Sequence, residues 1–350
     1  MNRQELLDSL AMVKPGLSNF DLVPILTHFC FSEGTVLAYN DVLAIEAEVD
    51  IDLDCGVPGD VMLSMLGSMK TKDIEVEQSD AEILIKAGRS KAKLAVLPKE
   101  DYLFKMPATK SADKLRVGPD FINGLRKCLI SVGDDPTHPE QTGIVLIASK
   151  AEVSLYSTDN KTLSKYEVDE EYDIKSQVLV ILTKEFCDQL VAISTKLPKN
   201  KIDLFIDTKN DYVIASFEEE VTVYSKLLDD SSVSDFDSIL DKFSMSSKSF
   251  VPIPADLKEA TARAQIILKS AVDKELHIAI KKRTLQVEAK SSFGEVKEPI
   301  AMSKSFDETT FIIDSDMFAR PIDSCKDISF QQGAVLFRDE AFIHLVSHFE

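Results

Sequence analysis

The sequence repeats one pattern of predicted elements three times, and this repeat limits the fold more than any other feature does. Each copy consists of a helical segment, a strand–turn–strand hairpin, a second helix and a pair of alternating strands. The hairpins occupy residues 34–49, 151–168 and 283–296, with an Asp at the turn of the first two copies, Asp41 and Asp159. Repetition at roughly the length of a small domain predicts three copies of one unit, typical of a scaffold more than of a single active site.

The chain of 350 residues is long enough for three such copies, each with its own core. We place the domains at residues 1–114, 115–241 and 250–350, with a linker rich in Ser and Asp before the third. In each domain two amphipathic helices cover one face of an antiparallel sheet, so the predicted fold class is α+β. The predicted helices are 3–13, a segment around 59–69, one beginning at 119, 184–195, one opening at Pro254, and 316–325, the last disturbed by Pro321.

Composition is that of an ordinary globular protein, with 44% hydrophobic and 28% charged residues. No apolar run approaches the roughly 20 residues of a membrane span, and the first residues lack a signal-peptide core. The five Cys are scattered without a CxxC pair, as expected of reduced thiols. We therefore expect a cytoplasmic protein with no membrane partner.

Signals of catalysis are weak. The sequence has no GxGxxG, P-loop, GxSxG or HExxH motif. His344 and His348 share i,i+4 spacing, but on a predicted strand end this spacing places them too far apart to hold one metal ion. We expect no enzyme activity, no cofactor and no metal.

Five short segments and one single position occur in the same order as in one known family. They are residues 23–26, 87–98 (a Gly-Arg-Ser strand that ends in Leu-Pro), 157–159, Leu163, 225–229 and 262–264. With these segments the whole chain resembles, in register, the bacterial-type DNA sliding clamp, the β subunit of DNA polymerase III. The resemblance implies that two three-domain chains close head to tail into a homodimeric ring, with helices around the hole and sheets as the outer wall. It also implies a non-catalytic processivity factor that encircles duplex DNA and tethers a DNA polymerase, with a clamp loader as a further partner.

A ring around DNA implies cations on the polar sides of the helices, where they make loose contacts with phosphates. The net charge of −19 argues against binding through overall charge, but it leaves local basic surfaces open. For any single cation, solvation of an exposed helix face is an equally good explanation, and a Lys near a helix C-terminus also suits the helix dipole. The predicted DNA-facing residues are Arg126, Lys127, Lys196, Lys199, Lys258, Arg263, Lys269 and Arg320.

The resemblance also implies a groove between the second and third domains that binds short apolar peptides of partner proteins. The matching positions are Thr158, Leu163, Ile239, Leu345 and Ser347, although Leu163 and Ile239 alone would be read as ordinary packing. The chain departs from the family at residues 345–350, which replace a Met-Pro-Met-like ending, and at Phe20, where relatives often have Arg. We therefore expect a divergent or phage-encoded clamp with its own peptide preference.

The implied dimer interface pairs the strand of Leu115 and Val117 with Ile266 and Ile267 of the second chain, because an exposed edge strand can continue a sheet. Helical spacing directs Ile267 toward its own core and Ile266 outward, so Ile266 is the stronger candidate. An alternative hypothesis is a three-repeat, β-rich scaffold that binds proteins but does not encircle DNA. In that case the cations of the helices are incidental.

Overall fold

The computed structural model describes residues 1–20, 23–150, 152–170, 177–197, 201–218, 220–231 and 233–349. Its contacts divide the chain into two compact units. Unit 1 comprises Met1–Ile122, Glu170–Ser176 and Glu185–Leu228, and unit 2 comprises Asn123–Asp169, Gln177–Lys184 and Asp229–Glu350. Since each unit combines segments from two of the predicted domains, the boundaries at 1–114, 115–241 and 250–350 stay a prediction.

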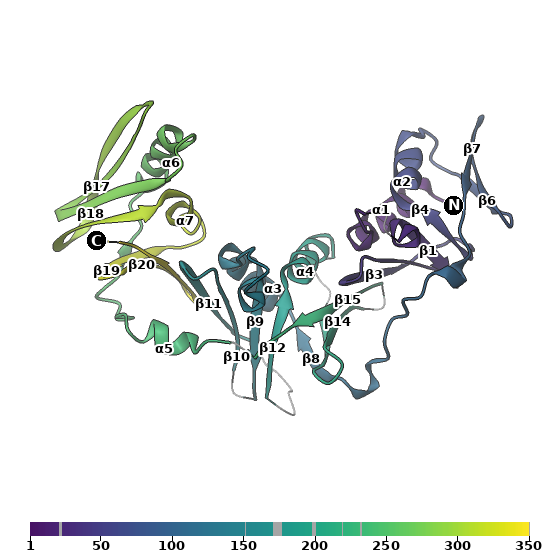
Figure 1. Ribbon diagram of the computed structural model, residues 1–350, viewed down its shortest axis with the longest axis horizontal. Helices are drawn as coiled ribbons and strands as arrows, with labels where there is room; N and C mark the ends of the chain where they lie inside the picture. The colour runs from purple at the N-terminus through teal and green to yellow at the C-terminus, as the bar shows by residue number, and fades with distance from the viewer. Residues whose placement is uncertain are drawn as a thin grey trace. The chain divides into compact units, whose positions relative to one another are not determined.

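Unit 1 contains a large antiparallel sheet and a smaller one. The large sheet has the order β8 (Asp113–Val117), β13 (Ile202–Asp207), β14 (Tyr212–Phe217), β15 (Val221–Leu228), β3 (Leu43–Glu48), β2 (Thr35–Tyr39), β1 (His28–Ser32) and β4 (Cys55–Pro58). The smaller sheet consists of β5 (Glu75–Gln78), β6 (Glu82–Ala87) and β7 (Ser90–Ala95). Helices α1 (Arg3–Val13) and α2 (Gly59–Ser68) lie on one face of the β1–β4 strands, and α4 (Lys184–Lys196) follows later in the chain (Figure 1).

Unit 2 repeats this plan. Its large sheet has the order β16 (Val251–Pro252), β19 (Asp327–Gln331), β20 (Ala334–Asp339), β21 (Phe342–Ser347), β11 (Thr162–Val168), β10 (Val153–Thr158), β9 (Gly143–Ala148) and β12 (Val178–Thr183). A long hairpin, β17 (Glu275–Ser291) and β18 (Gly294–Asp314), forms its second sheet. The helices are α3 (Pro119–Cys128), of which the part from Asn123 on belongs to this unit, α5 (Phe236–Leu240), α6 (Leu257–Leu268) and α7 (Ser315–Ala319).

Local sequence accounts for several of these elements. Asn2 caps α1 because its side chain accepts a hydrogen bond from the Gln4 amide, and Leu6, Leu10 and Val13 form its buried face. The β2–β3 turn is fixed by the Asn40 side chain, which accepts a hydrogen bond from the Leu43 amide at 2.9 Å. In α3, a Cβ on Gly124 would lie 2.7 Å from the Tyr166 ring, so the absent side chain lets the helix pack closely on β11.

The structure confirms the α+β class and several of the predicted elements, including the helix at Arg3–Val13. Two predictions about the third repeat were wrong. The hairpin is not limited to residues 283–296, because β17 and β18 extend over 275–291 and 294–314, where many β18 side chains are exposed and give no apolar alternation. Helix α7 ends at Ala319 rather than Cys325, two residues before Pro321, which cannot donate the next helical hydrogen bond.

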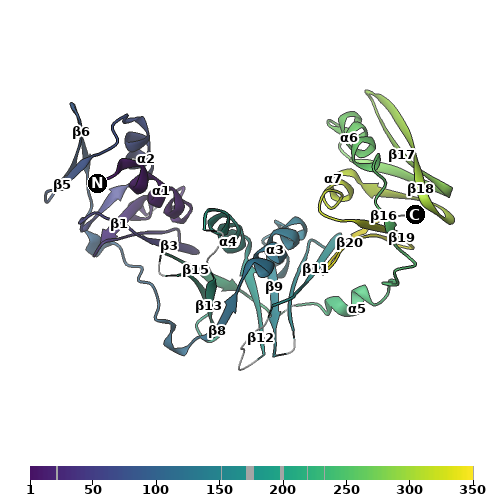
Figure 2. The ribbon, with the colours of Figure 1, turned by 180° about the vertical axis from the view of Figure 1, so that it is seen from behind.

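In each unit the sheet continues between strands far apart in the sequence. We call β2, β3 and β15 of unit 1 the first junction, and β10, β11 and β21 of unit 2 the second junction. Each junction is crossed by a connecting segment on the face of the sheet opposite to the helices: residues 98–112 in unit 1 and the segment with α5 in unit 2 (Figure 2). Within the described residues, no helix is long and apolar enough to cross a membrane.

Candidate partner-binding and DNA-facing sites

The second junction brings together four of the five predicted peptide-groove residues. Thr158 of β10 pairs with Leu163 of β11, and Leu163 pairs with Leu345 of β21. Ser347 lies two residues beyond Leu345, and its amide donates to the Lys161 carbonyl at 2.8 Å. Thr158 and Ser347 are half-buried, while Leu163 and Leu345 are buried, so the patch is an apolar floor with polar groups at its margin.

The fifth residue, Ile239, is on α5, which is tied to the same sheet by side chains that the sequence did not point to. The Tyr156 hydroxyl donates to both carboxylate oxygens of Asp237 at 3.1 Å, and Lys165 Nζ lies 3.0 Å from Asp237 Oδ1. The rings of Tyr156 and Phe236 stack with centroids 5.2 Å apart. Burial lowers the pKa of Lys165, but hydrogen bonds to Glu167 and Asp237 outweigh this effect and raise it. Lys165 therefore stays charged and holds α5 in place.

The predicted DNA-facing cations fall into two groups. Lys127 is 13% exposed, with Nζ 2.5 Å from Asp339 Oδ2, and Arg263 forms a two-pronged ion pair with Glu298 at 2.6 and 3.2 Å. Lys258 pairs with Asp323 at 2.8 Å, and Arg320 donates to the Ile130 carbonyl at 3.1 Å. A phosphate contact by any of these residues has to compete with an existing partner.

The second group is free of such partners. Arg126 on α3, Lys196 at the end of α4 and Lys269 after α6 are exposed, and none forms an ion pair with any residue that the structure describes. Lys199 lies outside the described residues. Arg126, Lys196 and Lys269 are therefore the best supported of the predicted phosphate contacts.

The predicted interface residues differ in accessibility. Leu115 and Val117 are 2% and 1% exposed, and their strand β8 pairs with β13. Their side chains belong to the core of unit 1, so only the backbone of β8 remains for a second chain. Ile266 is 71% exposed and Ile267 half-buried, as helical spacing predicted for α6.

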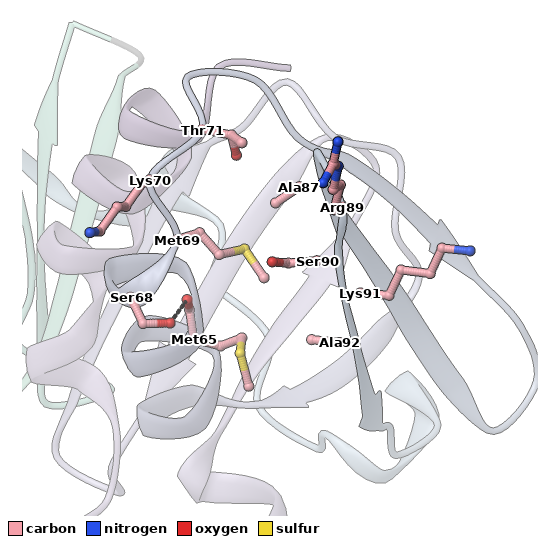
Figure 3. Close-up of a pocket in the computed structure, with 10 residues that line it drawn as sticks. All are labelled: Met65, Ser68, Met69, Lys70, Thr71, Ala87, Arg89, Ser90, Lys91 and Ala92. Atoms are coloured by element: carbon pink, nitrogen blue, oxygen red, sulfur yellow. Dashed lines mark hydrogen bonds between the residues drawn. The ribbon is translucent and has the colours of Figure 1, made fainter.

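A pocket that the sequence did not predict lies in unit 1 (Figure 3). Its volume is about 560 Å³, and Met65 and Met69 from the end of α2 face Ser90 and Ala92 of β7 across it (Figure 3). Lys70, Arg89 and Lys91 add cations around it. Within the described residues β7 pairs with β6 alone, which leaves its outer edge open. The signal in the sequence is the helical spacing of Met62, Met65, Leu66 and Met69, which we did not interpret as a site.

Three groups that could support catalysis, His344, Cys30 and Cys55, are buried. His344 is fully buried, with Nδ1 2.9 Å from Ser164 Oγ, and burial, with a smaller effect of the Arg320 charge, lowers its pKa to about 3. Burial raises the pKa of the Cys30 and Cys55 thiols to about 11. Within the part of the chain that the structure describes, no group of three or more His, Cys, Asp or Glu side chains could hold a metal ion.

The two repeated sheets, the helices on one face and the connecting segments on the other define the sliding-clamp fold. More particularly, it is the fold of bacterial DNA polymerase III β subunits. The β subunit of Thermotoga maritima has a TM-score of 0.86 at 16% identity, covering 100% of this chain and 98% of that one. The Pseudomonas aeruginosa sliding clamp bound to griselimycin has a TM-score of 0.88 at 14% identity, with coverage of 100% and 98%.

The sliding clamp of Bacillus subtilis is similar to the same extent, with a TM-score of 0.86 at 17% identity and coverage of 100% and 98%. No family model matches the sequence, and no curated protein matches it. The chain is thus a divergent example of this fold, similar over its whole length in structure but not detectably similar in sequence by these comparisons.

Proposed function

We propose that the protein is a non-catalytic DNA sliding clamp: a homodimeric cytoplasmic ring that encircles duplex DNA and tethers a DNA polymerase. The observation that carries this proposal is that the whole chain, rather than one domain, matches β subunits at TM-scores of 0.85 to 0.88. Encirclement holds a protein on DNA by topology, so strong binding to phosphates is unnecessary. A net charge of −19 with a few free cations on helices is compatible with such a mechanism.

The DNA itself provides the first test. The protein is incubated at micromolar concentration with nicked circular DNA, and bound protein is separated by gel filtration before and after a restriction enzyme linearises the circle. We expect protein to remain on circles and to leave linear DNA. Equal loss from both forms would contradict encirclement and would favour the scaffold.

The cations are tested in the same assay. Replacing Arg126, Lys196 and Lys269 together by Ala should reduce retention and lower the salt dependence of binding, by about 0.9 in log–log slope per lost phosphate contact. A control variant with the same charge change carries Ala at Lys150, Lys209 and Lys226, which lie on strands and turns. If both triple variants bind DNA equally well, the helix cations are incidental.

For ring closure we propose that Ile266 of one chain enters the pocket between α2 and β7 of the other chain. Met65, Met69 and Ala92 offer an apolar lining, and methionine side chains adapt readily to an inserted group. The open edge of β7 is suited to pairing with a strand of the second chain, as in other sheet-continuing interfaces. This proposal keeps Ile266 and Ile267 from the sequence prediction, and it leaves to Leu115 and Val117 at most a backbone role.

Replacing Ile266 by Lys should weaken the dimer, because an ammonium group would be buried against methionines and beside the cations Lys70, Arg89 and Lys91. We expect at least about a tenfold increase in the dimer dissociation constant, measured by analytical ultracentrifugation. Val42→Lys, a change of the same kind in the β2–β3 turn, is the control. An unchanged dimer in the Ile266 variant would exclude this interface.

The second junction is the proposed docking site for the polymerase and the clamp loader. Thr158, Leu163, Leu345 and Ser347 lie together there, and Ile239 is carried by α5, which is held to the same sheet. An apolar floor with few polar groups suits a short peptide with apolar side chains.

A further inference from the structure

The two junctions have the same strand register, which allows their residues to be matched one by one. In the second junction, Thr158 pairs with Leu163 and Leu163 pairs with Leu345. In the first junction, Tyr39 pairs with Ala44 and Ala44 pairs with Tyr224. Tyr39, Ala44 and Tyr224 are therefore the counterparts of the proposed peptide-groove residues.

This counterpart groove is filled by the chain itself. The Phe104 ring stacks on Tyr39 with centroids 4.0 Å apart, and its centroid lies 5.0 Å from that of Tyr224. Tyr102, which is 6% exposed, belongs to the same apolar cluster, and Met106 packs against it. Leu103 between them is 89% exposed. Residues 102–106 thus alternate inward and outward as an extended peptide does.

Side chains rather than a β-ladder hold this segment. Among the described residues, no strand includes residues 98–112. The backbone is fixed at its two ends, where Leu97 exchanges hydrogen bonds with Gly56 at 2.8 and 2.9 Å and the Tyr212 hydroxyl donates to the Ala108 carbonyl at 3.2 Å. Between these points the contacts are those of an apolar peptide in a groove.

We propose that residues 102–106 are an internal plug: they occupy, at the first junction, a groove that otherwise accepts an aromatic side chain of an extended apolar peptide. The plug confines partner binding to the second junction, so each chain offers one groove rather than two. This inference rests on the proposed peptide site of the second junction, but the occupancy of the first groove can be tested without any partner.

Tethering explains why modest contacts keep the groove filled. A segment anchored at both ends acts at an effective concentration in the millimolar range, which a free peptide at micromolar concentration cannot match. An open groove therefore requires the inward side chains to be removed while the chain remains connected.

The test uses the full-length chain and a labelled synthetic peptide that copies residues 100–107. In the variant with Ala at Tyr102, Phe104 and Met106, we expect this peptide to bind at least about tenfold more tightly than it binds the unchanged protein. A benzoylphenylalanine in place of Phe104 in the peptide should cross-link to the segments of Tyr39 and Tyr224. The control replaces the outward residues Leu103 and Lys105 by Ala and should gain no site. A folded triple variant with no new site, or cross-links only at the second junction, would overturn the proposal.

A second measurement tests the internal plug even if the triple variant fails to fold. The single variant Phe104→Ala should be cleaved by trypsin after Lys105 faster than Leu103→Ala, because only the first loses contacts with Tyr39 and Tyr224. Equal cleavage rates would show that Phe104 does not hold the segment, and would overturn the plug. Since neither assay involves DNA or a polymerase, failure of the clamp proposal would leave both results interpretable.

Discussion

The first and second junctions share a backbone plan and differ in chemistry on both faces of the sheet. On the helix side, the first junction pairs Ile45 with Val223, both fully buried and apolar. At the matching position, the second junction pairs Ser164 with His344, and Ser131 joins them with its hydroxyl 2.8 Å from that of Ser164. On the opposite face, the first junction is covered by Phe104, while the second presents Leu163 and Leu345 beside α5.

This comparison indicates that the same strand register can support either an apolar junction or a junction with a buried polar cluster. On the helix side, the apolar pair of the first junction leaves no polar side-chain atom to satisfy, whereas on the opposite face the hydroxyl of Tyr102 in the plug is buried without a hydrogen-bond partner among the described residues. A buried Ser–His–Ser cluster satisfies some polar atoms and leaves one unsatisfied, since His344 Nε2 has no hydrogen-bond partner among the described residues. Such a buried polar cluster fixes which side chains pack against one another, but the loss of one member leaves buried polar atoms without a hydrogen bond.

The largest expected effect comes from breaking the polar cluster. His344→Ala should lower the free energy of opening of β21 by about 3 kcal/mol, because it leaves a cavity and removes one of the two hydrogen-bond partners of the Ser164 hydroxyl. Val223→Ala at the matching position removes apolar volume only and should cost about 2 kcal/mol. Hydrogen exchange of the β21 and β15 amides measures both. An equal or smaller loss at His344 would mean that the two connections are energetically alike.

A second difference concerns pH. The folded pKa of His344, about 3, lies below the ordinary value of 6.5, so the neutral form is the one that folding favours. Below pH 6.5 the unfolded state binds a proton that the folded state does not. The free energy of unfolding is therefore highest above pH 6.5 and decreases as pH falls toward 3, by up to about 1.4 kcal/mol per pH unit. The double variant Ser164→Ile, His344→Val copies the first junction into the second and should reduce this slope for β21. An unchanged slope would assign the acid sensitivity to other groups.

The sequence predicted those features that depend on local pattern. Leu6, Leu10 and Val13 recur at helical spacing and gave the bounds of α1, because burial of one face fixes the period. The resemblance to clamps placed Thr158, Leu163 and Leu345 at one site, and the strand register brings these three together.

Features that depend on distant partners could not be predicted. Nothing near Lys127 or Arg263 in the sequence indicates that Asp339 and Glu298 pair with them. The plug was missed because five alternating residues without strand partners resemble any loop. Leu115 and Val117 were assigned to the dimer interface by resemblance alone. A resemblance identifies corresponding positions along the chain, but it does not show whether each side chain is buried.

The smallest expected effect concerns the contacts that hold α5 beside the groove of the second junction. In the first junction, the plug belongs to the corresponding connecting segment. Asp237→Asn keeps the shape of the side chain but removes the charge opposite Lys165. Because the Asp237 side chain is 57% exposed, solvent screens the pair, and we expect a loss of no more than about 1 kcal/mol. Hydrogen exchange at the Ser238, Ile239 and Leu240 amides should accelerate accordingly, and less so at high salt, since salt screens exposed charges. Asp241→Asn removes the same charge at the end of α5 from a residue that forms no ion pair with Lys165, and it should leave these amides unchanged. If the two variants exchange alike, the stacking of Phe236 on Tyr156 holds α5 without help from the ion pair, and both connecting segments are then anchored in the same way, by aromatic contact.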